Sequence, residues 1–175
     1  VENRSWVVFL QGMAAPSAAA SEVLHSQALK MAMTLERQAD FRLLRYRNEI
    51  LDTGGSEVLA ANLKRQMEEF RGRPAGQEFA VQYVMVLNSL GKKSGALEEV
   101  RRQLELVGNE KGIWRDRLLL LYGVLSSPED DTGRAVLESL VETGTNHEWM
   151  AMGLRLLTSR FKVNEKITIF LDNIL

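Results

Sequence analysis

Hydrophobic residues recur every three or four positions along this chain, which is the spacing of one face of an α-helix. In segment 56–71, for example, Leu59, Leu63 and Met67 fall on one stripe, while Lys64 and Glu68 fall on the other face. No Ile- or Val-rich run is flanked by an Asn-Gly or Asp-Gly turn, so β-hairpins are not expected. The pattern predicts an all-α chain of about ten helices. Because the intervening loops are short, consecutive helices are expected to pack antiparallel.

The same periodicity predicts helices over 77–90, 95–107 and 111–125. The last of these contains four consecutive leucines, from Leu118 to Leu121. A helix that is apolar on all sides is buried on all sides. We therefore expect this helix to be central in the packing.

Polar residues and glycines mark the expected helix ends. Gly54 suits a helix stop, and Ser56 is placed to cap the next helix. Ser127 followed by Pro128 predicts a cap with proline at the first helical position. Thr145, three residues before Glu148, has the spacing of a capping box.

Four positions suggest an internal repeat. Tyr46, Ala80 and Trp114 are spaced 34 residues apart, and Trp149 follows Trp114 by 35 residues. Each position is expected in the first turns of a helix that precedes a second helix. A helix–turn–helix period of about 34 residues is typical of tetratricopeptide repeats.

The stretch 77–109 resembles one unit of the tetratricopeptide-repeat (TPR) superfamily of α-helical repeats. Gly91 stands where the first helix of such a unit ends, Ala96 where two helices approach, and the run 104–106 (Leu-Glu-Leu) where the unit closes. The stretch departs from the pattern at Val84, where a small residue is expected, and at Gly108, where a proline is expected. Two-helix repeats of the HEAT type are the alternative interpretation.

The resemblance implies a single α-helical repeat domain over 1–175, or a fragment of a larger repeat protein. Stacked helical pairs would form a right-handed α-α superhelix, a TPR-like solenoid with a concave groove. By analogy with that fold, we expect a non-enzymatic scaffold or adaptor that binds a peptide or helix of another protein. The candidate partner-binding residues are Arg42, Arg45, Tyr46, Tyr83, Trp114 and Trp149.

The amino-acid composition excludes several kinds of catalytic and metal-binding site. The chain has no cysteine, which excludes disulfides, cysteine-ligated zinc and thiol catalysis. Its two histidines, His25 and His147, are far apart in sequence, and no glycine-rich phosphate-binding loop is present. We therefore expect no enzyme activity, no cofactor and no bound metal ion.

An arginine-rich segment suggests an alternative function, that of a nucleic-acid-associated regulatory domain. Its basic residues are Arg37, Arg42, Arg45 and Arg47. The acidic residues Glu36, Asp40 and Glu49 are interspersed among them, which indicates a solvated and partly balanced helix face. The chain has 22 Lys and Arg against 23 Asp and Glu, for a net charge of −1, so nucleic acid is not the expected partner.

The chain contains no apolar run of the ~20 residues that span a bilayer, so membrane insertion is not expected. We expect a cytoplasmic location. Apolar residues crowd the last nine positions, at Ile167, Ile169, Phe170, Leu171, Ile174 and Leu175. An apolar final helix predicts a fold-back onto its neighbour, contact with a further repeat, or a homo-oligomer contact.

Overall fold

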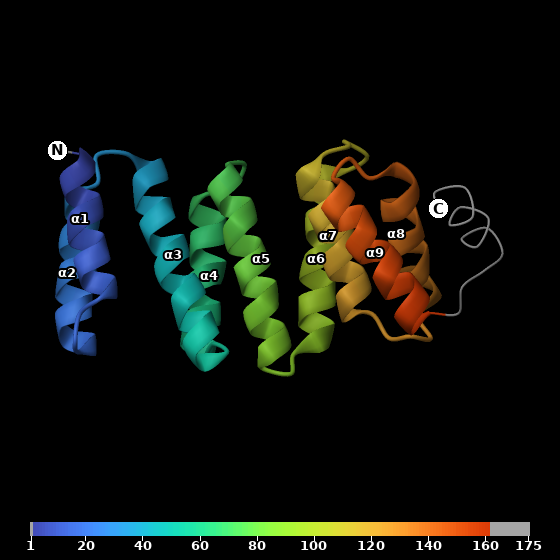
Figure 1. The fold of residues 1–175 in the computed structure, drawn as a ribbon, viewed down its shortest axis with the longest axis horizontal. Coiled ribbons are helices and arrows are strands. Elements are labelled where there is room, and N and C mark those ends of the chain that lie inside the picture. Colours follow the sequence, from blue (N-terminus) through green and yellow to red (C-terminus); the bar gives the residue numbers. More distant parts are fainter. Residues whose placement is uncertain (1, 162–175) are drawn as a thin grey trace. The chain divides into compact units, whose positions relative to one another are not determined.

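A computed structural model describes residues 2–161, and in that range the regular structure is entirely α-helical (Figure 1). The prediction of an all-α chain is therefore confirmed for this part of the chain. Nine helices lie within these residues, against about ten expected for the whole sequence. They are α1 (Glu2–Met13), α2 (Ala18–Met31), α3 (Leu35–Thr53), α4 (Glu57–Glu69), α5 (Pro74–Ser89), α6 (Lys93–Val107), α7 (Ile113–Leu125), α8 (Asp131–Thr143) and α9 (His147–Arg160).

The helices form two compact units, Val1–Leu90 and Gly91–Leu175. Helices α1–α5 belong to the first unit and α6–α9 to the second. The boundary falls inside the TPR-like stretch 77–109, so α5 and α6 belong to different units. A single repeat domain over 1–175 stays a prediction.

In the first unit, α4 packs on α5, and α3 lies against α5. Their apolar faces meet in a core that contains Leu63, Phe70 and Phe79, each almost completely buried. Phe70 and Phe79 are in ring contact, with centroids 5.6 Å apart. The hydrophobic stripe predicted for segment 56–71 is thus the buried face of α4.

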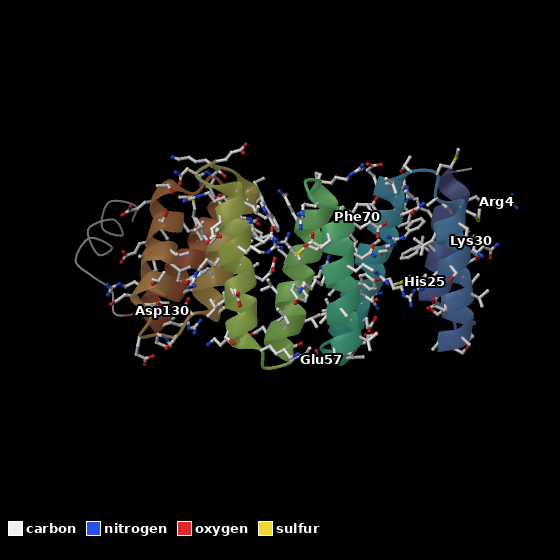
Figure 2. All side chains as sticks on the ribbon, turned by 180° about the vertical axis from the view of Figure 1, so that it is seen from behind. Arg4, His25, Lys30, Glu57, Phe70 and Asp130 are labelled. Atoms are coloured by element: carbon white, nitrogen blue, oxygen red, sulfur yellow. The ribbon has the colours of Figure 1, made fainter. Side chains whose placement is uncertain are left out.

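Helices α1 and α2 pair with each other, and α2 also contacts α3. Phe9 of α1, Ala28 of α2 and Phe41 of α3 form a second buried cluster in the first unit. The side of α2 that carries His25 faces α3, whereas Lys30 lies on the far side (Figure 2).

In the second unit, α7 packs against α6, α8 and α9. Leu118, Leu119 and Leu120 are buried, as predicted for a central helix. The prediction that this helix is buried on all sides was wrong, because Leu121 is half-buried and Ile113 and Val124 are exposed. Gly123 permits the close approach of α8: a Cβ atom there would lie 2.3 Å from the Leu137 side chain. Leu137 is itself fully buried in the core of this unit.

Two predicted helix ends are confirmed. Gly54 ends α3 in the left-handed conformation, with φ 74°. Ser56 caps α4, because its Oγ accepts a hydrogen bond from the backbone N of Leu59 at 3.1 Å. Both signals are local, so the sequence was sufficient to identify them.

The prediction of a capping box at Thr145 was wrong. Asn146 caps α9 instead, and its Oδ1 accepts from the backbone N of Trp149 at 3.0 Å. Thr145 Oγ1 donates to the carboxylate of Asp116, 2.8 Å away on α7. The hydroxyl group that the local pattern assigned to a helix cap is therefore bound by the carboxylate of Asp116, which is distant in sequence.

The cap predicted at Ser127 was also wrong. Helix α8 begins at Asp131, and Asp130 caps it by accepting a hydrogen bond from the backbone N of Thr132 at 2.9 Å. Ser127 Oγ instead donates to the Glu129 carboxylate. Ser127 and Pro128 therefore belong to a turn that precedes the helix.

Among residues 2–161, no helix combines the length and apolar character needed to cross a bilayer. In the same residues, no group of three or more His, Asp or Glu side chains is arranged to hold a metal ion. The apolar C-terminal segment and its predicted contacts lie outside the described residues.

Candidate functional site

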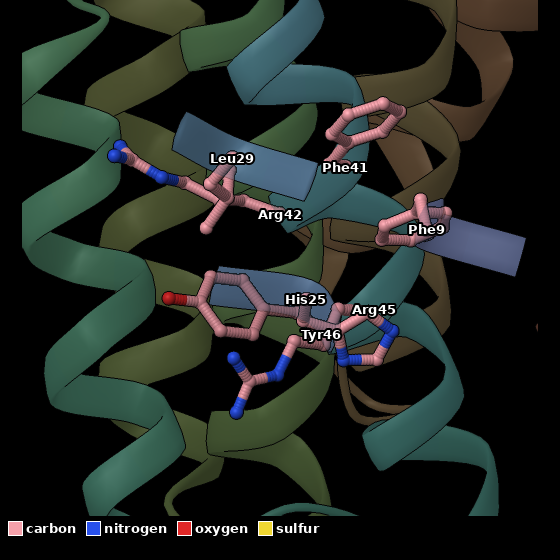
Figure 3. Close-up of a pocket in the computed structure, with 7 residues that line it drawn as sticks. All are labelled: Phe9, His25, Leu29, Phe41, Arg42, Arg45 and Tyr46. Carbon is pink, nitrogen blue, oxygen red and sulfur yellow. The ribbon is translucent and has the colours of Figure 1, made fainter. Parts of the chain in front are cut away.

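A pocket of about 70 Å³ lies among α1, α2 and α3 in the first unit. Figure 3 shows aromatic side chains on one side of it and the arginines and tyrosine of α3 extending toward the other side. The seven lining residues are Phe9, His25, Leu29, Phe41, Arg42, Arg45 and Tyr46. The pocket thus combines aromatic surface, two guanidinium groups, a phenol and an imidazole.

Stacked aromatic rings form its rigid wall. The Phe9 and Phe41 rings are nearly parallel, with centroids 4.6 Å apart. Trp6 packs edge-on against Phe41 at 4.7 Å, and the Arg37 guanidinium lies over the Trp6 ring at 5.0 Å. Aromatic packing of this kind fixes the position of α1 and α2 on α3.

The two arginines already hold carboxylates from neighbouring helices. Arg45 binds both carboxylate oxygens of Glu22 on α2, through Nη2 and, at 3.4 Å, through Nη1. Nη1 of Arg42 lies 3.2 Å from each carboxylate oxygen of Glu69 on α4 and also donates to the side chain of Gln66. The i, i+3 spacing of Arg42 and Arg45 on α3 places their side chains along one side of the helix.

Tyr46 lies between the two guanidinium groups in Figure 3. Its ring packs edge-on against Phe79, with centroids 6.3 Å apart. Burial raises the pKa of Tyr46, and the positive charges of Arg42 and Arg45 oppose that rise. The hydroxyl is therefore protonated at neutral pH and is able to donate a hydrogen bond.

His25 lines the pocket and is buried, with 5% of its surface exposed. Its ring packs on Phe9 at 4.9 Å, and its Nδ1 lies 3.4 Å from Ser21 Oγ. The other ring nitrogen, Nε2, is buried without a hydrogen-bond partner. A Cβ atom on Gly12 would lie 2.7 Å from this ring, so the glycine permits the close approach of α1.

Burial lowers the pKa of His25, and Arg45 lowers it further, while Glu22 acts in the opposite direction. The unfolded chain therefore takes up a proton at a higher pH than the folded chain does. We expect the free energy of unfolding to decrease as pH falls below about 6.5, until the pH lies below the folded pKa. Urea denaturation at about pH 7.5 and about pH 5 measures this change.

A His25→Gln variant should show a smaller dependence on pH, whereas His147→Gln, at an exposed histidine, should keep that of the wild type. An equal pH dependence in the wild type and His25→Gln would show that other groups cause it. The NMR titration of the His25 ring reports the direction of its pKa shift independently.

The structure brings together three of the six candidate partner-binding residues. Arg42, Arg45 and Tyr46 line the pocket. Tyr83 of α5 packs instead against the core of the first unit.

The two candidate tryptophans belong to the second unit. Trp149 of α9 packs against the leucine core. Trp114 of α7 is partly buried, its Nε1 has no hydrogen-bond partner, and Arg117 lies over its ring at 5.9 Å. The described contacts give each tryptophan a packing role in this unit.

A second cavity, of about 330 Å³, lies in the second unit between the α7–α8 turn and the end of α9. Its arginines are already engaged. Arg160 donates to the backbone oxygens of Val124 and Ser126, and Arg134 pairs with Asp131 at 3.2 Å. Phe161, at its edge, is the last described residue. The residues that follow Phe161 lie outside the described part of the chain, whereas every element that forms the first pocket is described, so the first pocket is the better candidate.

Sequence reasoning missed the residues that other helices bring to the first pocket, above all Phe9 and His25. It also sought the balancing charges within α3, whereas Glu22 and Glu69 provide them from α2 and α4. No signal within α3 identifies these distant partners. The chain matches no protein-family model, no curated protein and no solved structure.

Proposed function

We propose that this protein is a non-enzymatic scaffold or adaptor that binds a peptide or helix of another protein. The observation that carries the proposal is the pocket on α3, where Arg42, Arg45 and Tyr46 present hydrogen-bond donors beside a rigid aromatic wall. Arginine and tyrosine are enriched among residues that dominate the energy of protein interfaces. The pocket would accept one anchoring side chain of the partner.

The proposal includes a TPR-like stacking of two-helix repeats and a concave binding groove. Contacts within each unit support it, because α3 packs on α5 and α7 packs on α9. These next-but-one helices carry the pairs Tyr46 and Ala80, and Trp114 and Trp149, which are 34 and 35 residues apart. Stacked helical pairs bring equivalent helices into contact in this way.

Exposed apolar side chains on α3 would add contact area for a partner. Leu44 and Leu51 are both exposed, seven residues apart, with the exposed Arg47 between them in sequence. This spacing places the two leucines on one stripe of the helix.

The nucleic-acid alternative gains no support from the arginines of α3. Arg42 and Arg45 pair with glutamates, and Arg37 lies over Trp6. Less positive charge is available on this helix than its sequence indicates. Because phosphate contacts dominate nucleic-acid affinity, this arrangement favours a protein partner.

Selection of a displayed library of random peptides against the purified chain tests the proposal. We expect peptides that bind the chain saturably with one-to-one stoichiometry by calorimetry and do not bind an unrelated helical protein. The proposal fails if no such peptide is enriched. Binding of a nucleic-acid oligomer at low salt, with a steep loss of affinity as salt rises, would favour the alternative function instead.

A further inference from the structure

We propose that Arg45, which lines the pocket on α3, recognises a carboxylate of the partner peptide, and that Glu22 now occupies the place of that acidic side chain. This inference rests on the proposed function and specifies the chemistry of the peptide. In the absence of a partner, Arg45 is held by Glu22 of the same chain. Binding would exchange that intramolecular carboxylate for one from the partner.

The Arg45 guanidinium shows the geometry that carboxylate binding requires. Its two terminal nitrogens contact the two oxygens of Glu22. A planar guanidinium fork matches a carboxylate in this bidentate way. Arg42 approaches both oxygens of Glu69 with Nη1 alone, at 3.2 Å, so Glu22 is the glutamate that stands in for a ligand.

Exposure indicates which partner of each pair is exchangeable. The Glu22 side chain is 56% exposed against 35% for Arg45, and Glu69 is 44% exposed against 24% for Arg42. In both pairs the arginine is the more buried partner, while the glutamate is free to turn toward solvent. Exposed ion pairs contribute little to stability, so replacing one carboxylate by another is inexpensive.

The rest of the lining favours a carboxylate over a larger or multiply charged anion. The pocket is small, with a volume of about 70 Å³, which suits the end of one acidic side chain. The protonated Tyr46 hydroxyl offers a further donor. The net charge of −1 provides no general attraction for a polyanion.

Fluorescence anisotropy with a labelled peptide of alternating glutamate and leucine tests the exchange in the full chain. Glu22→Gln removes the internal competitor, so we expect it to tighten binding about fivefold or more. Arg45→Gln removes the guanidinium group that binds the carboxylate, so we expect it to weaken binding about tenfold or more. Arg45→Lys should give an intermediate loss of binding. Arg71→Gln removes the same charge and also breaks an exposed ion pair with a glutamate, Glu68, but outside the pocket, so it should change affinity less than about twofold.

Two further probes separate carboxylate recognition from general anion binding. The matched peptide of glutamine and leucine should bind weakly and should not respond to Glu22→Gln. Inorganic phosphate should compete only weakly with the acidic peptide. Far-UV circular dichroism of each variant confirms that it retains the helical fold.

Several outcomes would overturn the carboxylate proposal. They are no binding of the acidic peptide to the wild type or Glu22→Gln, equal losses for Arg45→Gln and Arg71→Gln, and equal competition by phosphate. If library-selected peptides bind but are neutral, or bind Arg45→Gln as well as the wild type, the adaptor function stands and this inference fails. If the library yields no binding peptide, the proposed function itself fails.

Discussion

Replacing Asp116 with alanine should lower the free energy of unfolding of the second unit by about 3 kcal/mol. Asp116 is 1% exposed, and its Oδ2 accepts three hydrogen bonds: from the backbone N of Thr145 at 2.6 Å, from Thr145 Oγ1 at 2.8 Å and from the backbone N of Asn146 at 2.9 Å. Alanine would leave all three donors without their acceptor at the start of α9. Urea denaturation followed by tryptophan fluorescence measures the loss, in a Trp6→Phe background where Trp114 and Trp149 are the remaining tryptophans.

Two variants distinguish the loss of the hydrogen bonds to Asp116 from a general effect of charge. Asp116→Asn keeps the size of the side chain and one acceptor oxygen, so it should lose about half as much stability as Asp116→Ala. Asp131→Ala removes an aspartate whose side chain is 89% exposed, and it should change stability by less than about 1 kcal/mol. Similar losses in Asp131→Ala and Asp116→Ala would show that the carboxylate does not hold the loop before α9.

The hydrogen bonds of Asp116 also show which features could not be predicted from the sequence. Helix α4 and its cap at Ser56 follow from a hydrophobic stripe and a neighbouring polar residue, and both were correctly predicted. The start of α9 depends on a hydrogen bond between residues 29 positions apart. Thr145 has the local spacing of a capping box, but the buried carboxylate is a better acceptor for its hydroxyl and its backbone N–H.

The candidate site likewise contains residues that could be predicted from the sequence and residues that could not. Arg42, Arg45 and Tyr46 share one helix, so their proximity was predictable from their spacing. Phe9 and His25 reach the pocket only through the packing of α1 and α2 on α3. That packing depends on small contacts, such as Gly12 against the His25 ring, which a periodic pattern does not encode.

The close approach of α7 and α8 should make Gly123 and Leu137 strongly coupled. Leu137→Ala alone should cost about 3 kcal/mol, because Leu137 is fully buried and its removal leaves a cavity. Gly123→Ala alone should cost about 1–2 kcal/mol, because its new methyl group would lie 2.3 Å from Leu137, an overlap that outweighs the ~1 kcal/mol gained in helix propensity. Urea denaturation of the two single variants and the double variant gives the coupling.

In the double variant, the methyl group added at position 123 would occupy space that the leucine side chain has vacated, so the clash disappears and the helix propensity gain remains. We therefore expect the double variant to be at least as stable as Leu137→Ala, with a coupling of about 2–3 kcal/mol. Gly112→Ala is the control for a methyl group added without a clash, because Gly112 has nothing within 4 Å of an added Cβ; at the N-cap of α7 this change should cost less than about 1 kcal/mol. Additive losses in the double variant would mean that α7 and α8 are not held at the separation that Gly123 permits.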